Sequence, residues 1–127
     1  MENILVDTNI LIDYTKSKSI FLKELLDKQT ASKVRLFINP VILSEFFTDS
    51  SLKNKIKYEY ALEFITNFSV IDLNKKIGIL SGEYRKNKAV DYIADALIAA
   101  TCIENKFILA TRNKKHFTKV KGIRIIP

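Results

Sequence analysis

Three acidic residues, Asp7, Glu45 and Asp95, lie in segments of the sequence that are otherwise strongly apolar. Asp7 stands between two apolar runs in ILVDTNILIDY, Glu45 lies within PVILSEFF, and Asp95 interrupts the helical pattern ADALIAATCI. An ionised carboxylate is costly to bury without a partner. Three carboxylates that came together would also repel one another unless a cation neutralised them.

Oxygen ligands without a cluster of cysteines or histidines favour Mg²⁺ or Mn²⁺ over zinc. Such an ion lowers the pKa of a bound water and stabilises charge on a phosphate during displacement. The sequence therefore predicts that Asp7, Glu45 and Asp95 are catalytic metal ligands for phosphate chemistry. Each acid also has a simpler explanation that stays open. Asp7 or Asn9 would cap a following helix, an acid in the first turn favours the helix dipole, and Glu45 would be an ordinary surface glutamate.

The elements that must position these acids alternate along the chain. Short apolar runs of strand length, which look buried on both faces, occupy residues 4–6, 34–38, 68–73, 107–110 and 123–126. Helical patterns occupy residues 20–28, a segment after Asn39-Pro40, and residues 56–68, 76–86 and 91–105. This alternation predicts an α/β fold with a parallel sheet covered on both sides.

Two boundaries locate the functional end of that sheet. Asn39 is suited to cap a helix whose first residue is Pro40, where the missing N–H costs nothing. Asp7 closes the first strand, Asn39 closes the second, and residues 111–113 follow the fourth. Ligands of parallel sheets bind outside the carboxyl ends of the strands, so these positions are expected to meet at one edge.

The positive charge of the chain is concentrated near its C-terminus. The net charge is +7, and residues 105–127 hold seven basic residues and no acid, so they carry the whole excess. A basic segment of this kind favours an anionic partner such as nucleic acid, although a solvated basic tail explains it equally well. Arg112, Lys114 and Lys115 follow the fourth strand directly and are expected at the rim of the site, where they would attract a phosphodiester chain.

Size and composition limit the remaining possibilities. The 127 residues, 47% hydrophobic and 28% charged, suit a single folded domain over residues 1–127. Cys102, the only cysteine, has no internal disulfide partner and is expected as a small buried core residue. We find no signal peptide or long apolar run, so a cytoplasmic protein without a membrane partner is expected.

Several stretches together resemble the PIN-domain ribonucleases, and especially the VapC-type toxins of prokaryotic toxin–antitoxin pairs. The matching stretches, in the order and spacing of that family, are ILVDTNILIDY, NPVILSEF, ADALIAATCIENKFILATRN with KKHF, and GIRIIP. The resemblance implies a three-layer α/β/α sandwich and RNA cleavage that depends on Mg²⁺ or Mn²⁺. It also implies a cognate antitoxin that covers the site, and homodimers as in many members.

Carried over to this sequence, the resemblance makes Asp7, Glu45 and Asp95 the core metal-binding acids. Thr111 and Asn113 match a polar motif after the fourth strand and, with Arg112, Lys114 and Lys115, are expected to bind the substrate.

One position departs from the family. Many members have a fourth acid at the place of Asn113 or of His116, and both are non-acidic here. The number of metals therefore stays open, with Asp91 one turn before Asp95 as a possible aid. We interpret His116 as a surface or helix-end residue rather than a ligand. Two other functions remain: a PIN-like module that binds RNA or protein without cutting, and, more distantly, a phosphoacceptor fold.

Overall fold

The computed structural model describes residues 1–17 and 19–126, so Pro127, the last residue of the GIRIIP stretch, lies outside the described part. Within it, five strands form one parallel sheet in the order β3-β2-β1-β4-β5. The strands are β1 (Glu2–Val6), β2 (Val34–Ile38), β3 (Ser69–Val70), β4 (Ile108–Ala110) and β5 (Arg124–Ile126). Each strand overlaps a run that the sequence predicts as a strand.

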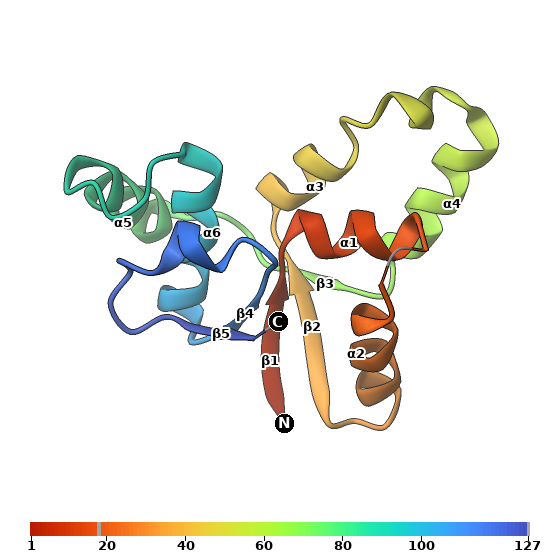
Figure 1. Cartoon of the computed structure of the whole chain (residues 1–127), viewed down its shortest axis with the longest axis horizontal. Coiled ribbons are helices and arrows are strands. Elements are labelled where there is room, and N and C mark those ends of the chain that lie inside the picture. Colours follow the sequence, from red (N-terminus) through yellow and green to blue (C-terminus); the bar gives the residue numbers. More distant parts are fainter. Residues whose placement is uncertain (18, 127) are drawn as a thin grey trace.

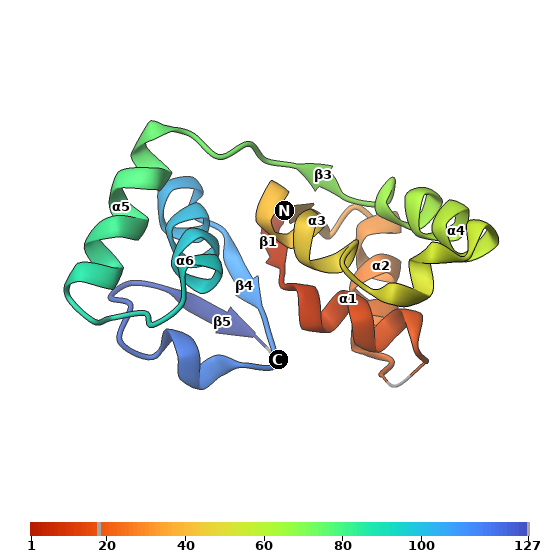
Figure 2. The same cartoon turned by 90° about the horizontal axis from the view of Figure 1, so that it is seen from above.

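Six α-helices of the described residues cover this sheet. They are α1 (Thr8–Thr15), α2 (Phe21–Thr30), α3 (Pro40–Phe46), α4 (Lys55–Ile65), α5 (Lys75–Lys86) and α6 (Ile93–Asn105). Figure 2 shows α1, α2 and α4 on one side of the sheet and α5 and α6 on the other, with the connection after β3 crossing between the two sides. The predicted three-layer α/β/α architecture is therefore confirmed. Two short 3-10 helices, η1 (Ser50–Lys53) and η2 (Lys114–Phe117), were not predicted.

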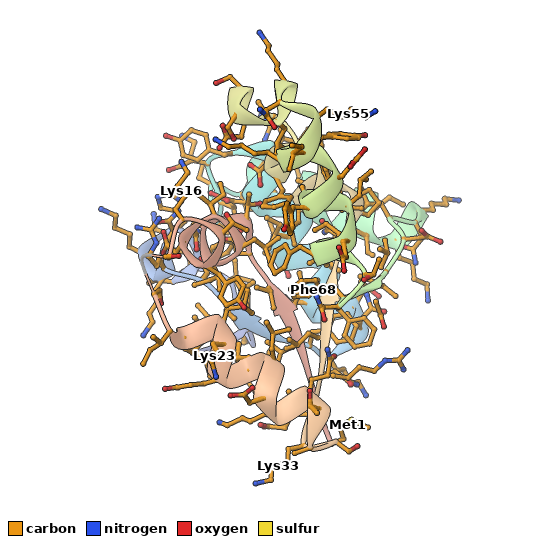
Figure 3. The ribbon with its side chains drawn as sticks, turned by 90° about the vertical axis from the view of Figure 1, so that its right-hand side faces the viewer. Met1, Lys16, Lys23, Lys33, Lys55 and Phe68 are labelled. Carbon is orange, nitrogen blue, oxygen red and sulfur yellow. The ribbon has the colours of Figure 1, made fainter. Side chains whose placement is uncertain are left out.

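The core is built around the central strands. Leu5 and Val6 of β1 and Leu109 and Ala110 of β4 have no exposed surface, as expected for parallel strands that are covered on both faces. The prediction that every strand is buried on both faces is wrong for the outer strands. Strand β3 is only two residues long and Val70 is 47% exposed, because the strand lies at an edge with a neighbour on one side only. Figure 3 shows Phe68, just before β3, among packed side chains, whereas Lys33 and Lys55 reach outward.

The carboxyl ends of the strands face a set of helix starts. In Figure 1, β1 and β2 rise toward α1 and α3, which lie at the upper end of the sheet. Asn39 caps α3 by accepting from the Ile42 N–H at 2.9 Å, and Pro40 is the first helical residue, as predicted. The Asn39 amide also donates to Thr101 of α6 at 3.0 Å. This buried contact fixes the start of α3, the helix that carries Glu45, against α6, the helix that carries Asp95.

No helix in the described ranges has both the length and the apolar character that a bilayer crossing requires.

Candidate active site

The three acids predicted from the sequence line one cavity at the carboxyl end of the sheet. Asp7 follows β1, Glu45 lies in α3, and Asp95 lies in the first turn of α6. The cavity, about 280 Å³ in volume, is called the acid-lined cavity below, and its other lining residues are Thr8, Asn9, Ile12 and Asn113. Residues up to 88 positions apart in the sequence, from Asp7 to Asp95, are thus brought together, while their catalytic role stays a prediction.

Asp7 is held by neutral donors on both of its carboxylate oxygens. Its Oδ1 accepts from the Thr8 N–H at 2.7 Å, so Asp7 is the N-cap of α1. Its Oδ2 accepts from the Thr111 hydroxyl at 2.8 Å and from the Asn9 amide at 3.2 Å. The capping explanation is therefore correct for Asp7, and its role as a metal ligand stays a prediction.

The environment of Asp7 opposes its negative charge. Asp7 is only 4% exposed, and burial raises the pKa of its carboxyl above the usual value. The hydrogen bonds from Thr111 and Thr8 lower this pKa, whereas the charges of Asp95 and Glu45 raise it further. In the described part of the chain, no lysine, arginine or histidine forms an ion pair with Asp7 or Glu45. These two acids therefore lack a positive partner within the described residues.

Glu45 is linked to Asp7 through Thr8. The Thr8 hydroxyl donates to Glu45 Oε1 at 2.7 Å, while the Thr8 N–H donates to Asp7. One residue in the first turn of α1 thus orients two of the three acids. Glu45 is exposed to solvent at the cavity, so it is a surface glutamate as the simpler explanation held, but one with a defined partner.

Asp95 contacts His116, which the sequence predicts as a surface or helix-end residue. His116 Nδ1 lies 3.0 Å from Asp95 Oδ2, and both side chains are partly buried. The N-cap of α6 is Tyr92, which forms no side-chain capping hydrogen bond, and Asp95 lies in the first turn of this helix, where its charge favours the helix dipole as the simpler explanation held. The position where many family members have a fourth acid is therefore occupied here by a histidine that contacts the third acid.

The predicted substrate-binding residues divide into two groups. Thr111 is fully buried and donates to Asp7, so it positions that acid and is not accessible to a substrate. This corrects the role expected for it. Asn113 lines the acid-lined cavity, and its N–H donates to the Thr111 hydroxyl at 3.1 Å.

The basic residues of this segment flank Asn113 in the sequence, but none of them lines the acid-lined cavity, so their contact with a substrate stays a prediction. Arg112, Lys114 and Lys115 are exposed. The Arg112 N–H donates to Asn9 at 3.1 Å, which joins the basic segment to the residues around Asp7. The Arg112 side chain pairs with Asp13 at 2.7 Å. Lys115 lies beside a neighbouring cavity that also contains Asp91 and Asp95.

Two other expectations concern single residues. Cys102 is buried in the core as predicted, and burial raises the pKa of its thiol far above the usual range, so it stays protonated. Asp91 is exposed and lines the neighbouring cavity rather than the acid-lined one. It therefore lies near Asp95 but is not one of the residues around Asp7.

The donor set fits a hard divalent cation. All the charged ligands available in the acid-lined cavity are carboxylates, which suit Mg²⁺ or Mn²⁺. One of them is buried, has two negative neighbours, and is held only by neutral donors. The side chains surround the cavity without forming a compact ligand cluster: across residues 1–17 and 19–126, no three acidic, histidine or cysteine side chains are close enough to hold an ion as they stand.

Comparisons with known proteins agree with this architecture. The family model of the PIN domain matches residues 4–123. Ribonuclease VapC2 of Methanocaldococcus jannaschii is 31% identical, with 97% of this chain and 92% of that protein covered. Ribonuclease VapC1 of Rickettsia felis is 24% identical, with 97% and 94% covered. The DNA-bound VapBC structure from Salmonella typhimurium contains a chain with a TM-score of 0.82 and 24% identity, covering 99% of this chain and 98% of that one.

The chain therefore belongs to the PIN-domain family. Both of these curated relatives carry the name Ribonuclease VapC, and the similarity extends over nearly the full length of each protein.

Proposed function

We propose that this protein is a metal-dependent endoribonuclease that acts as the toxin of a toxin–antitoxin pair. The observation that carries the proposal is the acid-lined cavity, in which Asp7, Glu45 and Asp95 meet. Among the described residues, Asp7 and Glu45 have no ion-pair partner, and Asp95 contacts only the imidazole of His116. The VapC ribonucleases among the relatives support RNA as the substrate. The VapBC complexes among the structural neighbours support an antitoxin as the partner.

In this mechanism the three acids would hold Mg²⁺ or Mn²⁺. When bound, the ion supplies an activated water and stabilises charge on the phosphate. Thr8 and Thr111 fix the carboxylate of Asp7, and Thr8 also fixes that of Glu45. His116 of η2 contacts Asp95 of α6 and helps to hold its carboxylate in place. Lys114 and Lys115 at the rim attract the phosphodiester chain.

The direct test is cleavage of total cellular RNA by the purified protein. We expect new RNA ends in the presence of Mg²⁺ or Mn²⁺, and none when EDTA removes the divalent ions. Sequencing of those ends in bacteria that express the chain would identify the target. Cutting that persists in EDTA would contradict the proposed metal dependence. The absence of cutting with either ion would contradict the proposed ribonuclease activity.

Thr111 provides a test of how the site is held. Thr111→Val is expected to lower the cleavage rate about 10- to 100-fold, the range seen when the partner of a metal ligand is lost. The valine keeps the buried volume and removes the hydroxyl that donates to Asp7. Thr111→Ser keeps the hydroxyl and should stay within a few-fold of wild type. Equal rates for the two variants would show that this hydrogen bond does not matter.

A protein partner has a surface available on α4. Ile56, Tyr58, Tyr60 and Leu62 of that helix are exposed, and a cavity of about 470 Å³ between α4, η1 and the end of α1 includes Phe46 and Phe64. Exposed apolar patches of this kind mark protein interfaces. An antitoxin, or a second copy of the chain in a homodimer, is proposed to use it. A cytoplasmic location stays a prediction.

A second candidate function is a PIN-like module that binds RNA or protein without cutting. The histidine and asparagine at the positions of the fourth acid, and the absence of a compact ligand cluster in the described residues, favour it. Titration calorimetry with Mn²⁺ separates the two functions. Heat of binding that disappears in Asp95→Asn supports the nuclease. No detectable binding, together with RNA binding that weakens with salt, supports the module.

A further inference from the structure

We propose that a second cavity, next to the acid-lined one, binds a single nucleotide of the RNA beside the bond that is cut. This cavity, called the lysine-lined cavity below, has a volume of about 260 Å³ and shares Asp95 with the acid-lined cavity. The side chains that carry the inference are Lys88, Tyr92, Lys115, His116 and Lys119. The inference rests on the proposed RNA-cleaving function and names a contact that the substrate makes there.

The lysine-lined cavity is formed by two segments that lie side by side. The connection from α5 to α6, residues 87–92, runs next to η2, as Figures 1 and 2 both show. Pockets for drug-sized ligands hold roughly 300 to 1,000 Å³, so this cavity suits one nucleotide rather than a longer segment. Because Asp95 borders both cavities, a nucleotide held here has its phosphate next to the acids.

Tyr92 supplies a flat aromatic face for a base. It is 63% exposed, so it contributes little to the core, and it occupies the N-cap of α6 without capping the helix. Serine, threonine, aspartate or asparagine would stabilise the helix at that position, so neither packing nor capping explains a tyrosine there. The Tyr92 ring lies 6.0 Å from the His116 ring at an angle of 46°. Exposed aromatic rings of this kind stack on the unpaired bases of RNA.

The charges around the cavity favour a phosphate. Lys88, Lys115 and Lys119 are all exposed at its edge. Two acids, Asp91 and Asp95, also line it. The three lysines outweigh these two acids even when no divalent ion is bound. Proteins that bind single-stranded nucleic acids combine an aromatic ring with basic side chains in the same way.

Lys88 allows a clean test because of its backbone. Its φ is 59°, in the left-handed region that favours glycine, so Lys88→Gly removes the charge and relieves the backbone. Lys106 offers a matched control: its φ is 57°, it also follows a helix, and it is also exposed. It lies at the far end of α6 from Asp95, about 16 Å along the helix axis at 1.5 Å per residue.

The experiment measures binding of a short fluorescein-labelled single-stranded RNA by anisotropy, in EDTA so that no cutting occurs. We expect Lys88→Gly to weaken binding several-fold and to reduce the slope of log K against log salt by about 0.7, the value for one phosphate contact on a single strand. Lys106→Gly should change neither. Tyr92→Ala should weaken binding about 5- to 100-fold, and Tyr92→Phe should bind as wild type does.

The possible outcomes separate this inference from the proposed function. If wild type cuts RNA but Lys88→Gly and Tyr92→Ala bind like wild type, the nucleotide site is wrong and the ribonuclease stands. If the variants show the expected losses but wild type cuts nothing, the RNA site stands and the catalytic proposal is wrong. If Lys88→Gly and Lys106→Gly weaken RNA binding equally, the effect comes from the overall charge of the protein, and the proposed site is wrong.

Discussion

Asp7→Asn is expected to lower the rate of RNA cleavage at least about 100-fold while the protein stays folded. The asparagine keeps the shape of the side chain and an oxygen for the Thr8 N–H, but it removes the negative charge that would hold the cation. Initial rates with Mn²⁺, measured on one RNA, would show the loss. Asp95→Asn should behave in the same way. The matched control is Asp27→Asn, which changes an exposed acid of α2 that pairs with Lys23.

For Asp7→Asn we also expect a difference in stability from wild type, and the pKa of Asp7 fixes how that difference changes with pH. Because burial and two negative neighbours raise the pKa of Asp7, the folded protein binds this proton more tightly than the unfolded chain does. The ionised carboxyl therefore destabilises the fold, and this cost disappears as the pH falls through the raised pKa. In metal-free buffer, the Tm of Asp7→Asn minus the Tm of wild type should thus be largest near neutral pH and should shrink toward acid pH.

The opposite trend would refute this account. A Tm difference that grows as the pH falls is the signature of a carboxylate that stabilises the folded state, with a lowered pKa. Cleavage by Asp7→Asn at the wild-type rate would in addition remove Asp7 from the mechanism.

The second large effect is expected at Phe117. Its side chain is fully buried in η2, which packs against α6. Phe117→Ala should lower the free energy of unfolding by about 3–5 kcal/mol, because it leaves a cavity in the core. That is a large share of the roughly 5–15 kcal/mol that holds such a domain together. Urea unfolding followed by circular dichroism would measure it.

Phe117 also supports the functional end of the molecule. Its neighbour His116 contacts Asp95, so loosening η2 should lower RNA cleavage as well as stability. Phe117→Leu, which keeps most of the apolar volume, should cost much less and retain activity. A free energy of unfolding for Phe117→Ala within about 1 kcal/mol of wild type would contradict the assigned burial.

The sequence predicts the frame of the fold well because its strongest signals are local. Strand β2 and helix α5 occupy nearly the predicted residues, since apolar runs and helical spacing are properties of neighbouring positions. The start of α3 was predicted to the residue because the Asn39-Pro40 pair fixes both the cap and the first helical φ. The exposure of the outer strands was not predicted, because a short apolar run looks the same whether its strand is central or at an edge.

The candidate site was predicted in part. The acids stood out because they lie within apolar sequence, and the carboxyl-end rule for parallel sheets placed them together. The contacts that hold them were missed. Thr8 reaches Glu45 across 37 positions, His116 reaches Asp95 across 21, and Thr111 reaches Asp7 across 104. No spacing rule connects residues at such separations. The only signal was that polar residues follow each strand, which does not say which acid each one serves.

The last of these contacts has a consequence for the order in which the chain is synthesised. Asp7 is made early, but its N–H donates to Ala110 at 2.9 Å and its carboxylate accepts from Thr111, so its surroundings do not exist until translation has passed that point. Strand β1 also lacks one of its two neighbours until β4 emerges. A partly made chain on the ribosome therefore has no assembled acid cluster. An activity directed at RNA would begin only after the codons for β4 and Thr111 have been read.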